Sequence, residues 1–514
     1  MPRRRHAALF LVALSALAAC SAGPSTRPVI AVRGGGDGQA PPTSASGTRE
    51  LPGLEDFGGR IDWSDCTAVT RTRMSGDVPT GGLTYDCARF SARLDAPSRP
   101  GRGTLQVELL KVGSGKSALV VLGDPDGEPG TVLAARMAAA LPADLLRTFT
   151  LIGMDRRGTG SSDGVQCVPG AARLGIVESD PGVASQERLL EHVGRASQEC
   201  VLDMENQLTA LDSWRTAADL EQLRVELKVD HLNAIGVGDG SKVLTTYAAR
   251  YPSAVGRFVL DGAPDPTLDV MGVAEAKAVA AQEAFEAFAA DCAVRGCALG
   301  ADAEKRFTAL LEKLRSTPLR DSTGIDVTAG TATRAVLVGL ADRGRWAELA
   351  DALVSAEGGD GAPLVRFVAP LVGGTEADPP RLDAGIVTTC NDTSSRVPPE
   401  RVAALAEDWG SKHPLFGAWH ARQLLVCGPF PVPQLDKAPK LEQVPPVLVV
   451  STAADPVTPE AGTERVAQSL PGGVLVGWQG GGHGALVNSA CAAGFAKDFL
   501  VDGKTPSNNT VCPP

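Results

Sequence analysis

The sequence lacks a Cys-x-x-Cys pair and any cluster of its 6 histidines. Because such groupings supply most structural zinc ligands, we expect no metal site, and we expect no cofactor. An excess of basic residues is also missing, since the formal net charge is -11. That balance argues against nucleic acid or anionic lipid as a main partner and favours a cationic or amine-bearing ligand.

No apolar run near the N-terminus is long enough to span a bilayer as a permanent helix. The run Ala7–Ala19 follows three arginines, which predicts an export signal over residues 1–19. It ends in Leu-Ala-Ala-Cys, which resembles the lipobox of bacterial lipoproteins. Cys20 is therefore expected to carry acyl chains that anchor the chain at the outer face of the cell membrane, its only membrane attachment. The alternative is an ordinary signal followed by a chance cysteine.

Residues 20–55 are rich in glycine, serine, proline and threonine and predict a flexible tether. After Cys20, ten cysteines remain, an even number that indicates disulfides in an exported protein. One sequence leaves their connectivity open, but neighbours along the chain suggest Cys66–Cys87, Cys167–Cys200, Cys292–Cys297, Cys390–Cys427 and Cys491–Cys512.

Apolar runs alternate with helical patterns over two parts of the chain, residues 56–266 and 426–514. This alternation predicts right-handed crossovers and a mostly parallel sheet flanked by helices, an α/β fold. The expected strands are Leu105–Val112, Ala118–Leu122, Phe149–Met154, a strand that begins at Leu232, Arg257–Leu260, Val447–Ser451 and Val474–Trp478.

Residues 267–425 have a different pattern, with alanine-rich helical stretches and no buried-strand runs. Such stretches are Ala274–Ala290, Ala303–Leu314 and Arg345–Ala356. We therefore expect a helical cap inserted into the sheet domain.

The stretch Leu232–Tyr247 predicts a buried strand that turns sharply into a helix. In α/β-hydrolases this turn is the nucleophile elbow, Gly-x-Ser-x-Gly, which presents a serine above the sheet. Here the same register is Gly236, Val237, Gly238, Asp239 and Gly240, so a glycine stands at the nucleophile position.

Two further residues follow later strands in the order that a Ser-Asp-His triad requires. Asp455 lies just past the strand that begins at Val447, and His483 lies in a glycine-rich turn after the next strand. In such a triad the acid orients the imidazole and stabilises its cation. We therefore expect Asp455 and His483 to be a retained acid and base.

Several segments together resemble the secreted bacterial tripeptidyl aminopeptidases, α/β-hydrolase serine peptidases related to prolyl iminopeptidases, from about Ile61 to Cys512. The segments are FTLIGMDRRGTGSS at 149–162, TAADLEQLR at 216–224, LVVSTAADPVTP at 448–459, GGHG at 481–484 and FLVDGKTPSNNTVC at 499–512. The resemblance implies an α/β-hydrolase fold with a cap that binds the free amino terminus of a peptide. It implies that Asp392, in a similar cap segment, contacts that amine.

The chain departs from this family at both halves of its acyl-transfer machinery. Gly238 replaces the serine, and GDPDGEPG at 123–130 replaces a glycine-rich oxyanion segment. Asp124 and other acids there would bring negative charge to a place where backbone N–H donors stabilise an oxyanion. The backbone N–H of Asp239 remains the candidate donor. These changes favour loss of peptidase activity.

Three functional alternatives stay open. The leading hypothesis is a degenerate, inactive exported lipoprotein that binds a peptide or amine ligand. The second is an active hydrolase that uses activated water or a displaced nucleophile, for which Asp239 and Ser241 are the candidates. The third is a structural envelope lipoprotein.

Overall fold

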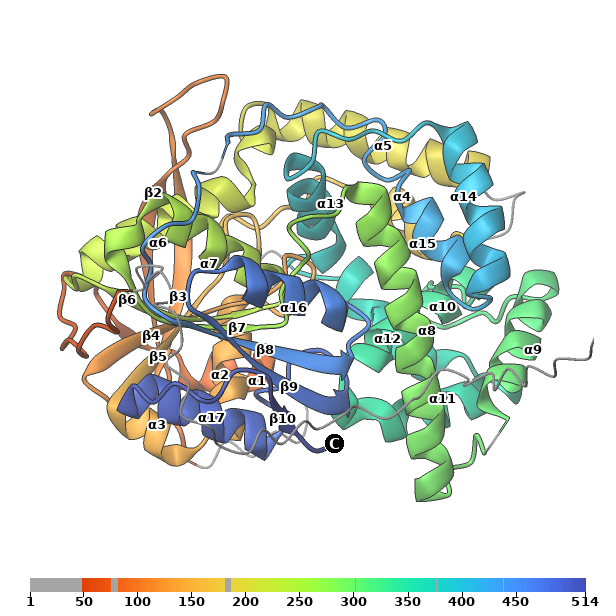
Figure 1. The fold of residues 1–514 in the computed structure, drawn as a ribbon. Helices are drawn as coiled ribbons and strands as arrows, with labels where there is room; N and C mark the ends of the chain where they lie inside the picture. Colours follow the sequence, from red (N-terminus) through yellow and green to blue (C-terminus); the bar gives the residue numbers. More distant parts are fainter. Residues whose placement is uncertain (1–48, 75–81, 181–185, 301, 376–377, 438) are drawn as a thin grey trace, which may run out of the picture. The chain divides into compact units, whose positions relative to one another are not determined.

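Short apolar runs rich in valine, leucine and isoleucine form most of the strands of one sheet (Figure 1). The protein is seen in a computed structural model that describes residues 49–74, 82–180, 186–300, 302–375, 378–437 and 439–514. The expected export signal, Cys20 and most of the tether lie outside these residues. The strands are β1 (Ser64–Asp65), β2 (Asp86–Arg93), β3 (Thr104–Val112), β4 (Ser117–Leu122), β5 (Phe149–Met154), β6 (Leu232–Val237), β7 (Val255–Asp261), β8 (Val447–Ala454), β9 (Gly473–Gly481) and β10 (Thr510–Cys512). Every strand expected from the sequence is present, and β1, β2 and β10 are additional.

The sheet has the strand order β1-β2-β3-β5-β4-β6-β7-β8-β9-β10. The pairs from β1 to β5 are antiparallel, whereas β5, β4 and all later neighbours pair in parallel. The carboxyl ends of β4, β6, β8 and β9 therefore meet at one edge, where α/β folds place their ligands. The loops that carry Asp124, Gly238, Asp455 and His483 follow these four strands.

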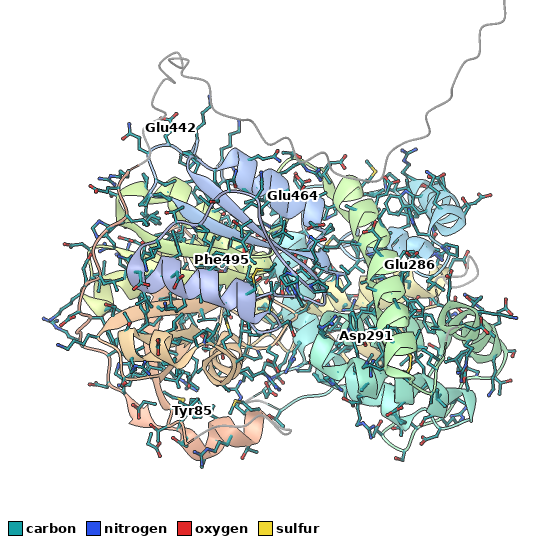
Figure 2. The ribbon with its side chains drawn as sticks, turned by 60° about the horizontal axis from the view of Figure 1, so that its bottom comes forward. Tyr85, Glu286, Asp291, Glu442, Glu464 and Phe495 are labelled. Carbon is teal, nitrogen blue, oxygen red and sulfur yellow. A yellow bond between two sulfur atoms is a disulfide. The ribbon has the colours of Figure 1, made fainter. Side chains whose placement is uncertain are left out.

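Helices cover both faces of the sheet and bury its apolar side chains (Figure 1). Along β4, Val120 packs with one set of helices and Val121 with the other, because successive side chains of a strand point to opposite faces. The first set is α6 (Ser213–Leu227), α7 (Asp239–Arg250) and α16 (Glu460–Ser469), and the second is α2 (Gly130–Ala140), α3 (Ala143–Thr148) and α17 (Ala490–Asp502), which Phe495 marks in Figure 2.

Between β7 and β8 the described residues form helices and add no strand to the sheet. Glu286 and Asp291 mark the first of these helices in Figure 2. The helices are α8 (Val270–Arg295), α9 (Ala303–Ser316), α10 (Ala329–Ala341), α11 (Trp346–Glu357), α12 (Ala362–Val372), α13 (Arg381–Asn391), α14 (Pro399–Lys412) and α15 (Gly417–Gln423). None of the helices in the described part of the chain is long and apolar enough to cross a membrane.

Two helices that precede the elbow also pack with this insertion. Leu189 and Val193 of α5 (Gln186–Met204) and Ile176 of α4 (Gly170–Val177) share one buried cluster with the insertion helices. The sequence boundary at residue 267 leaves α4 and α5 in the sheet domain. The reason is that an amphipathic crossover helix has the same sequence pattern whether it packs on a sheet or on other helices.

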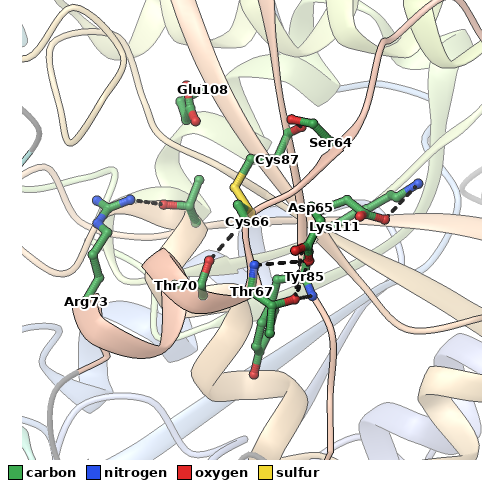
Figure 3. Close-up of a disulfide and its surroundings, with 12 residues drawn as sticks. Ser64, Asp65, Cys66, Thr67, Thr70, Arg73, Tyr85, Cys87, Glu108 and Lys111 are labelled. Carbon is green, nitrogen blue, oxygen red and sulfur yellow. Dashed lines mark hydrogen bonds and ion pairs between the residues drawn. A yellow bond between two sulfur atoms is a disulfide. The ribbon is translucent and has the colours of Figure 1, made fainter.

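Five disulfides join the ten cysteines in the pairs that neighbours along the chain suggest, Cys66–Cys87, Cys167–Cys200, Cys292–Cys297, Cys390–Cys427 and Cys491–Cys512. Figure 3 shows the first of them, which ties the start of α1 (Thr67–Arg73) to β2. The Thr67 hydroxyl donates to an Asp65 carboxylate oxygen at 2.7 Å beside this bond. Covalent links of this kind stabilise a fold chiefly by restricting the unfolded chain.

Candidate functional site

The backbone of the nucleophile elbow is intact although its serine is absent. Gly238 joins β6 to α7 with φ 58° and ψ -122°, a conformation that residues with a side chain rarely adopt. Its N–H donates to the Asp261 carbonyl at 3.1 Å, which fixes the turn. Glycine therefore keeps the strained turn at little steric cost.

The carboxylate of Asp124 occupies the place of the missing side chain. A Cβ added at Gly238 would lie 2.4 Å from Asp124 Oδ1, 2.6 Å from Asp124 Oδ2 and 2.7 Å from His483 Nε2. These distances are far inside van der Waals contact. A serine at residue 238 and the present position of Asp124 therefore exclude each other.

One carboxylate fills two functional positions at once. The backbone N–H of Asp239, the candidate oxyanion donor, donates to Asp124 Oδ1 at 2.7 Å. Asp124 Oδ2 lies 2.9 Å from His483 Nε2, the ring nitrogen that would face a serine hydroxyl. This N–H lies at the positive N-terminal end of α7, where a carboxylate is stabilised.

Asp455 and His483 lie together as the Ser-Asp-His order requires. Asp455 follows β8 and is 1% exposed, and its Oδ2 lies 2.9 Å from His483 Nδ1. Val457 and Thr458 donate their backbone N–H groups to Asp455 Oδ1 at 2.8 and 2.9 Å, which fixes the carboxylate. The acid and base geometry is thus complete.

His483 is held between two carboxylates. Burial opposes its charged form, but Asp455 and then Asp124 outweigh this cost and hold the pKa of His483 well above its usual range. Burial likewise opposes the charged form of Asp124, yet His483 and the Asp239 N–H lower the pKa of that carboxyl. The two carboxylates therefore favour the imidazolium form of the ring, and an imidazolium cannot accept a proton from a nucleophile.

Asp239 and Ser241 are both engaged away from His483. Arg156 donates to the Asp239 carboxylate at 2.6 Å, and despite burial Lys242 and Arg156 lower the pKa of Asp239 to about 2. The buried Ser241 hydroxyl lies 2.8 Å from the Gly236 carbonyl and 2.6 Å from the Gly262 carbonyl. Both ring nitrogens of His483 contact other groups. The geometry gives neither residue the position of a nucleophile.

Asp392, expected to bind a substrate amine, is already paired within the protein. Its Oδ2 lies 2.7 Å from the Lys242 ammonium and accepts the Ser213 hydroxyl at 2.6 Å, and its Oδ1 accepts the Ser213 N–H at 2.9 Å. The carboxylate is neutralised by Lys242 and is not free for an amine. This internal partner could not be inferred from the cap segment alone.

Of the acids between residues 123 and 130, only Asp124 enters the site. Asp126 lies 3.9 Å from Arg334, and Glu128 accepts the Arg136 Nε–H at 2.7 Å. The sequence predicted negative charge near the oxyanion position, but it did not show that one carboxylate would bond both the donor and the base. The sequence signal for this contact was the place of Asp124, which follows the end of β4 by one glycine, Gly123.

A cavity of about 440 Å³ opens beside the site, between the sheet edge and the inserted helices. Asp124 and His483 form part of its wall, and α8, α10 and α12 contribute apolar side chains such as Val273, Leu337 and Phe367. The described residues contain no group of three or more His, Cys, Asp or Glu side chains placed to hold a metal. The cavity has the size and apolar character of a small-molecule site.

The strand order, the elbow after β6 and the acid and base after β8 and β9 define an α/β-hydrolase. Residues 413–512 match the sequence model of a family described as TAP-like protein. The chain therefore has the α/β-hydrolase fold, and its residues 413–512 are similar to these TAP-like proteins.

Curated relatives extend the similarity to most of the chain. "Serine protease Hip1" of Mycobacterium tuberculosis is 26% identical over 488 residues, 89% of this chain and 91% of that protein. "Tripeptidyl aminopeptidase" of Streptomyces lividans is 24% identical over 483 residues, 88% of this chain and 87% of that protein. A solved hydrolase of Pseudomonas aeruginosa PA01 is 16% identical with a TM-score of 0.38, over 80% of this chain and 98% of that one.

We predict that His483 stays protonated well above pH 6.5, the usual value for histidine. Because its folded pKa is raised, the stability it contributes is complete below about pH 6.5 and is lost as pH rises through the folded pKa. ¹⁵N NMR of the imidazole, assigned with His483→Gln, measures the titration. In Asp124→Asn the pKa should fall, and a neutral wild-type ring at pH 7 would contradict the interpretation.

Proposed function

We propose that the protein is an exported α/β-hydrolase-fold protein without serine peptidase activity, and that it binds a small ligand in the cavity beside the former active site. One observation supports this most strongly. The Asp124 carboxylate lies where a serine side chain would lie and bonds both the oxyanion donor and the base. Its relatives named as a serine protease and an aminopeptidase suggest a peptide-sized cavity as the inherited feature.

The charge of Asp124, as well as its position, opposes serine peptidase activity. A serine peptidase needs a neutral imidazole and an N–H donor that is free for the developing oxyanion. Here the Asp239 N–H is used by Asp124, and the same carboxylate keeps His483 charged. A site that already contains its own anion gains little from binding an anionic transition state.

The alternative of a hydrolase with activated water or a displaced nucleophile has one observation in its favour, the contact of Asp124 with His483 at 2.9 Å. In this alternative the Asp124 carboxylate, which lies beside the base, would itself attack the substrate. However, the hydrolysis of an acyl or alkyl intermediate would need His483 as a base, and Asp455 would still favour the charged form of its ring. The third alternative, a structural role in the cell envelope, would require neither Asp124 nor His483.

Restoring the nucleophile tests the proposal directly. Wild type has no serine at residue 238 and should not react with a fluorophosphonate probe. Gly238→Ser should react only slowly, because Asp124 leaves no room for the serine hydroxyl beside His483. The double variant Gly238→Ser/Asp124→Gly should be labelled at least about tenfold faster than Gly238→Ser, since the hydroxyl then reaches the imidazole and the N–H is released. Labelling should disappear when His483→Ala is added.

A matched control uses the neighbouring acid. Gly238→Ser/Asp126→Gly removes a carboxylate two residues away that faces Arg334, and it should be labelled no faster than Gly238→Ser. Labelling of wild type, or equal labelling of Gly238→Ser and the double variant with Asp124→Gly, would refute the blocking role of Asp124. Wild-type turnover of tripeptide substrates that rises at alkaline pH would favour the hydrolase alternative.

We further propose that the chain is anchored to the outer face of the cell membrane through acyl chains on Cys20. The support is the basic and apolar start of the chain followed by a small-residue cysteine site. Membrane fractions of the native host should retain wild type and release Cys20→Ala into the medium. Equal membrane retention of both forms would exclude the lipid anchor.

A further inference from the structure

The charges on the wall of the 440 Å³ cavity differ from those expected for an amine site. The described lining contains four lysine or arginine residues and two acidic residues. The acids are Asp124, already bonded to His483, and Asp126, 3.9 Å from Arg334. No free carboxylate of the described lining is left for a ligand ammonium.

The basic side chains of the cavity wall differ in whether an acidic side chain of the protein pairs with them. Glu348 accepts two hydrogen bonds from Arg345 at 2.7 and 3.0 Å, so that guanidinium has its own partner. In the part of the chain that the structure describes, no hydrogen bond or ion pair is found for the Lys277 ammonium, which projects from α8 into the cavity lining. Lys277 therefore forms no direct ion pair with the described residues, although its charge, after those of Lys242 and Arg156, helps to lower the pKa of Asp239.

His420 adds a polar atom that has no partner. Its side chain is buried, 7% exposed, and its Nε2 forms no hydrogen bond within the described residues. Burial, Lys277 and Arg334 together lower the pKa of His420 to about 3, so the ring is neutral at physiological pH. A neutral ring with its proton on Nε2 donates a hydrogen bond, and a buried donor without an acceptor is costly.

The surroundings of these groups are apolar and aromatic. The Trp419 ring meets the His420 ring edge-on with centroids 4.9 Å apart, and Phe367 and Leu371 contribute to the same wall. This apolar wall offers no hydrogen-bond acceptor to the Lys277 ammonium, so a ligand carboxylate placed there would gain a charged hydrogen bond. A ligand that brings one negative charge on an apolar body would satisfy both requirements.

We propose that the cavity binds a small monocarboxylate with an apolar body, whose carboxylate contacts Lys277 and His420 and whose apolar part contacts the α10 and α12 side chains. Arg334, shared with Asp126, adds positive charge at the same end. The free carboxylate of a fatty acid and that of a short apolar peptide have this chemistry in common. This inference rests on the proposed ligand-binding function and replaces the expected amine by an acid.

Calorimetric titration with three eight-carbon ligands tests the charge requirement. Octanoate should bind to wild type and raise its Tm, octan-1-ol should bind at least about tenfold more weakly, and octylamine should not bind. N-acetylated trileucine and its C-terminal amide, which differ only in the carboxylate, distinguish a peptide source from a fatty acid source. Tighter binding of octylamine than of octanoate would overturn the proposal.

Variants of the anchor complete the test. Lys277→Met and Lys277→Gln should weaken octanoate binding at least about tenfold, because a charged hydrogen bond is lost. Their ligand-free Tm should equal or exceed that of wild type, since an unpaired charge is removed. Lys412→Met, at an exposed pair with Asp408 on α14, is the matched control and should bind octanoate as wild type does.

Two outcomes separate this inference from the proposed function. Unchanged octanoate binding in both Lys277 variants, or a lower ligand-free Tm in both, would overturn the carboxylate site even if the wild type remains silent to the fluorophosphonate probe. Hydrolysis of 4-nitrophenyl octanoate by wild type would overturn the proposed inactivity. In that case octanoate binding lost in Lys277→Met would still support the carboxylate site.

Discussion

The site depends on one imidazole held between two carboxylates. His483 contacts Asp455 on one ring nitrogen and Asp124 on the other, and both contacts lie at 2.9 Å. The first contact is the acid–base pair of an α/β-hydrolase triad. The second takes the place of the serine, so that the ring charge that would appear only during catalysis is present at rest. The same Asp124 carboxylate fills the space beside Gly238 and accepts the N–H of Asp239.

The α/β scaffold tolerates an aspartate carboxylate in place of the serine because Asp124, Gly238 and His483 come from separate loops at one edge of the sheet. β6 and α7 fix the turn between them, so the residue at position 238 has a positive φ whether it is a serine or a glycine. Asp124 comes from the loop after β4 and reaches the same point by a side-chain carboxylate. The cavity beyond it, with Lys277 on an inserted helix, is built from other elements, so ligand binding there does not require the lost chemistry.

The sequence predicted the parallel sheet, the elbow and the positions of Asp455 and His483, because apolar runs, glycines and strand ends are local signals. It predicted poorly what depends on contacts between distant residues. The pairing of Asp392 with Lys242, the bond from Asp124 to His483 and the packing of α5 with the cap each join segments far apart in the chain. A carboxylate in a loop gives no local sign of which cation it will meet.

The central claim is that Asp124 and His483 form a charged pair in the folded protein. A double-mutant cycle with Asp124→Asn, His483→Gln and the combined variant measures their coupling in the free energy of unfolding at pH 7. The account predicts a favourable coupling of about 1.5 kcal/mol or more, as found for close charge pairs that are shielded from water. A coupling within about 0.5 kcal/mol of zero, the range for independent sites, would contradict it.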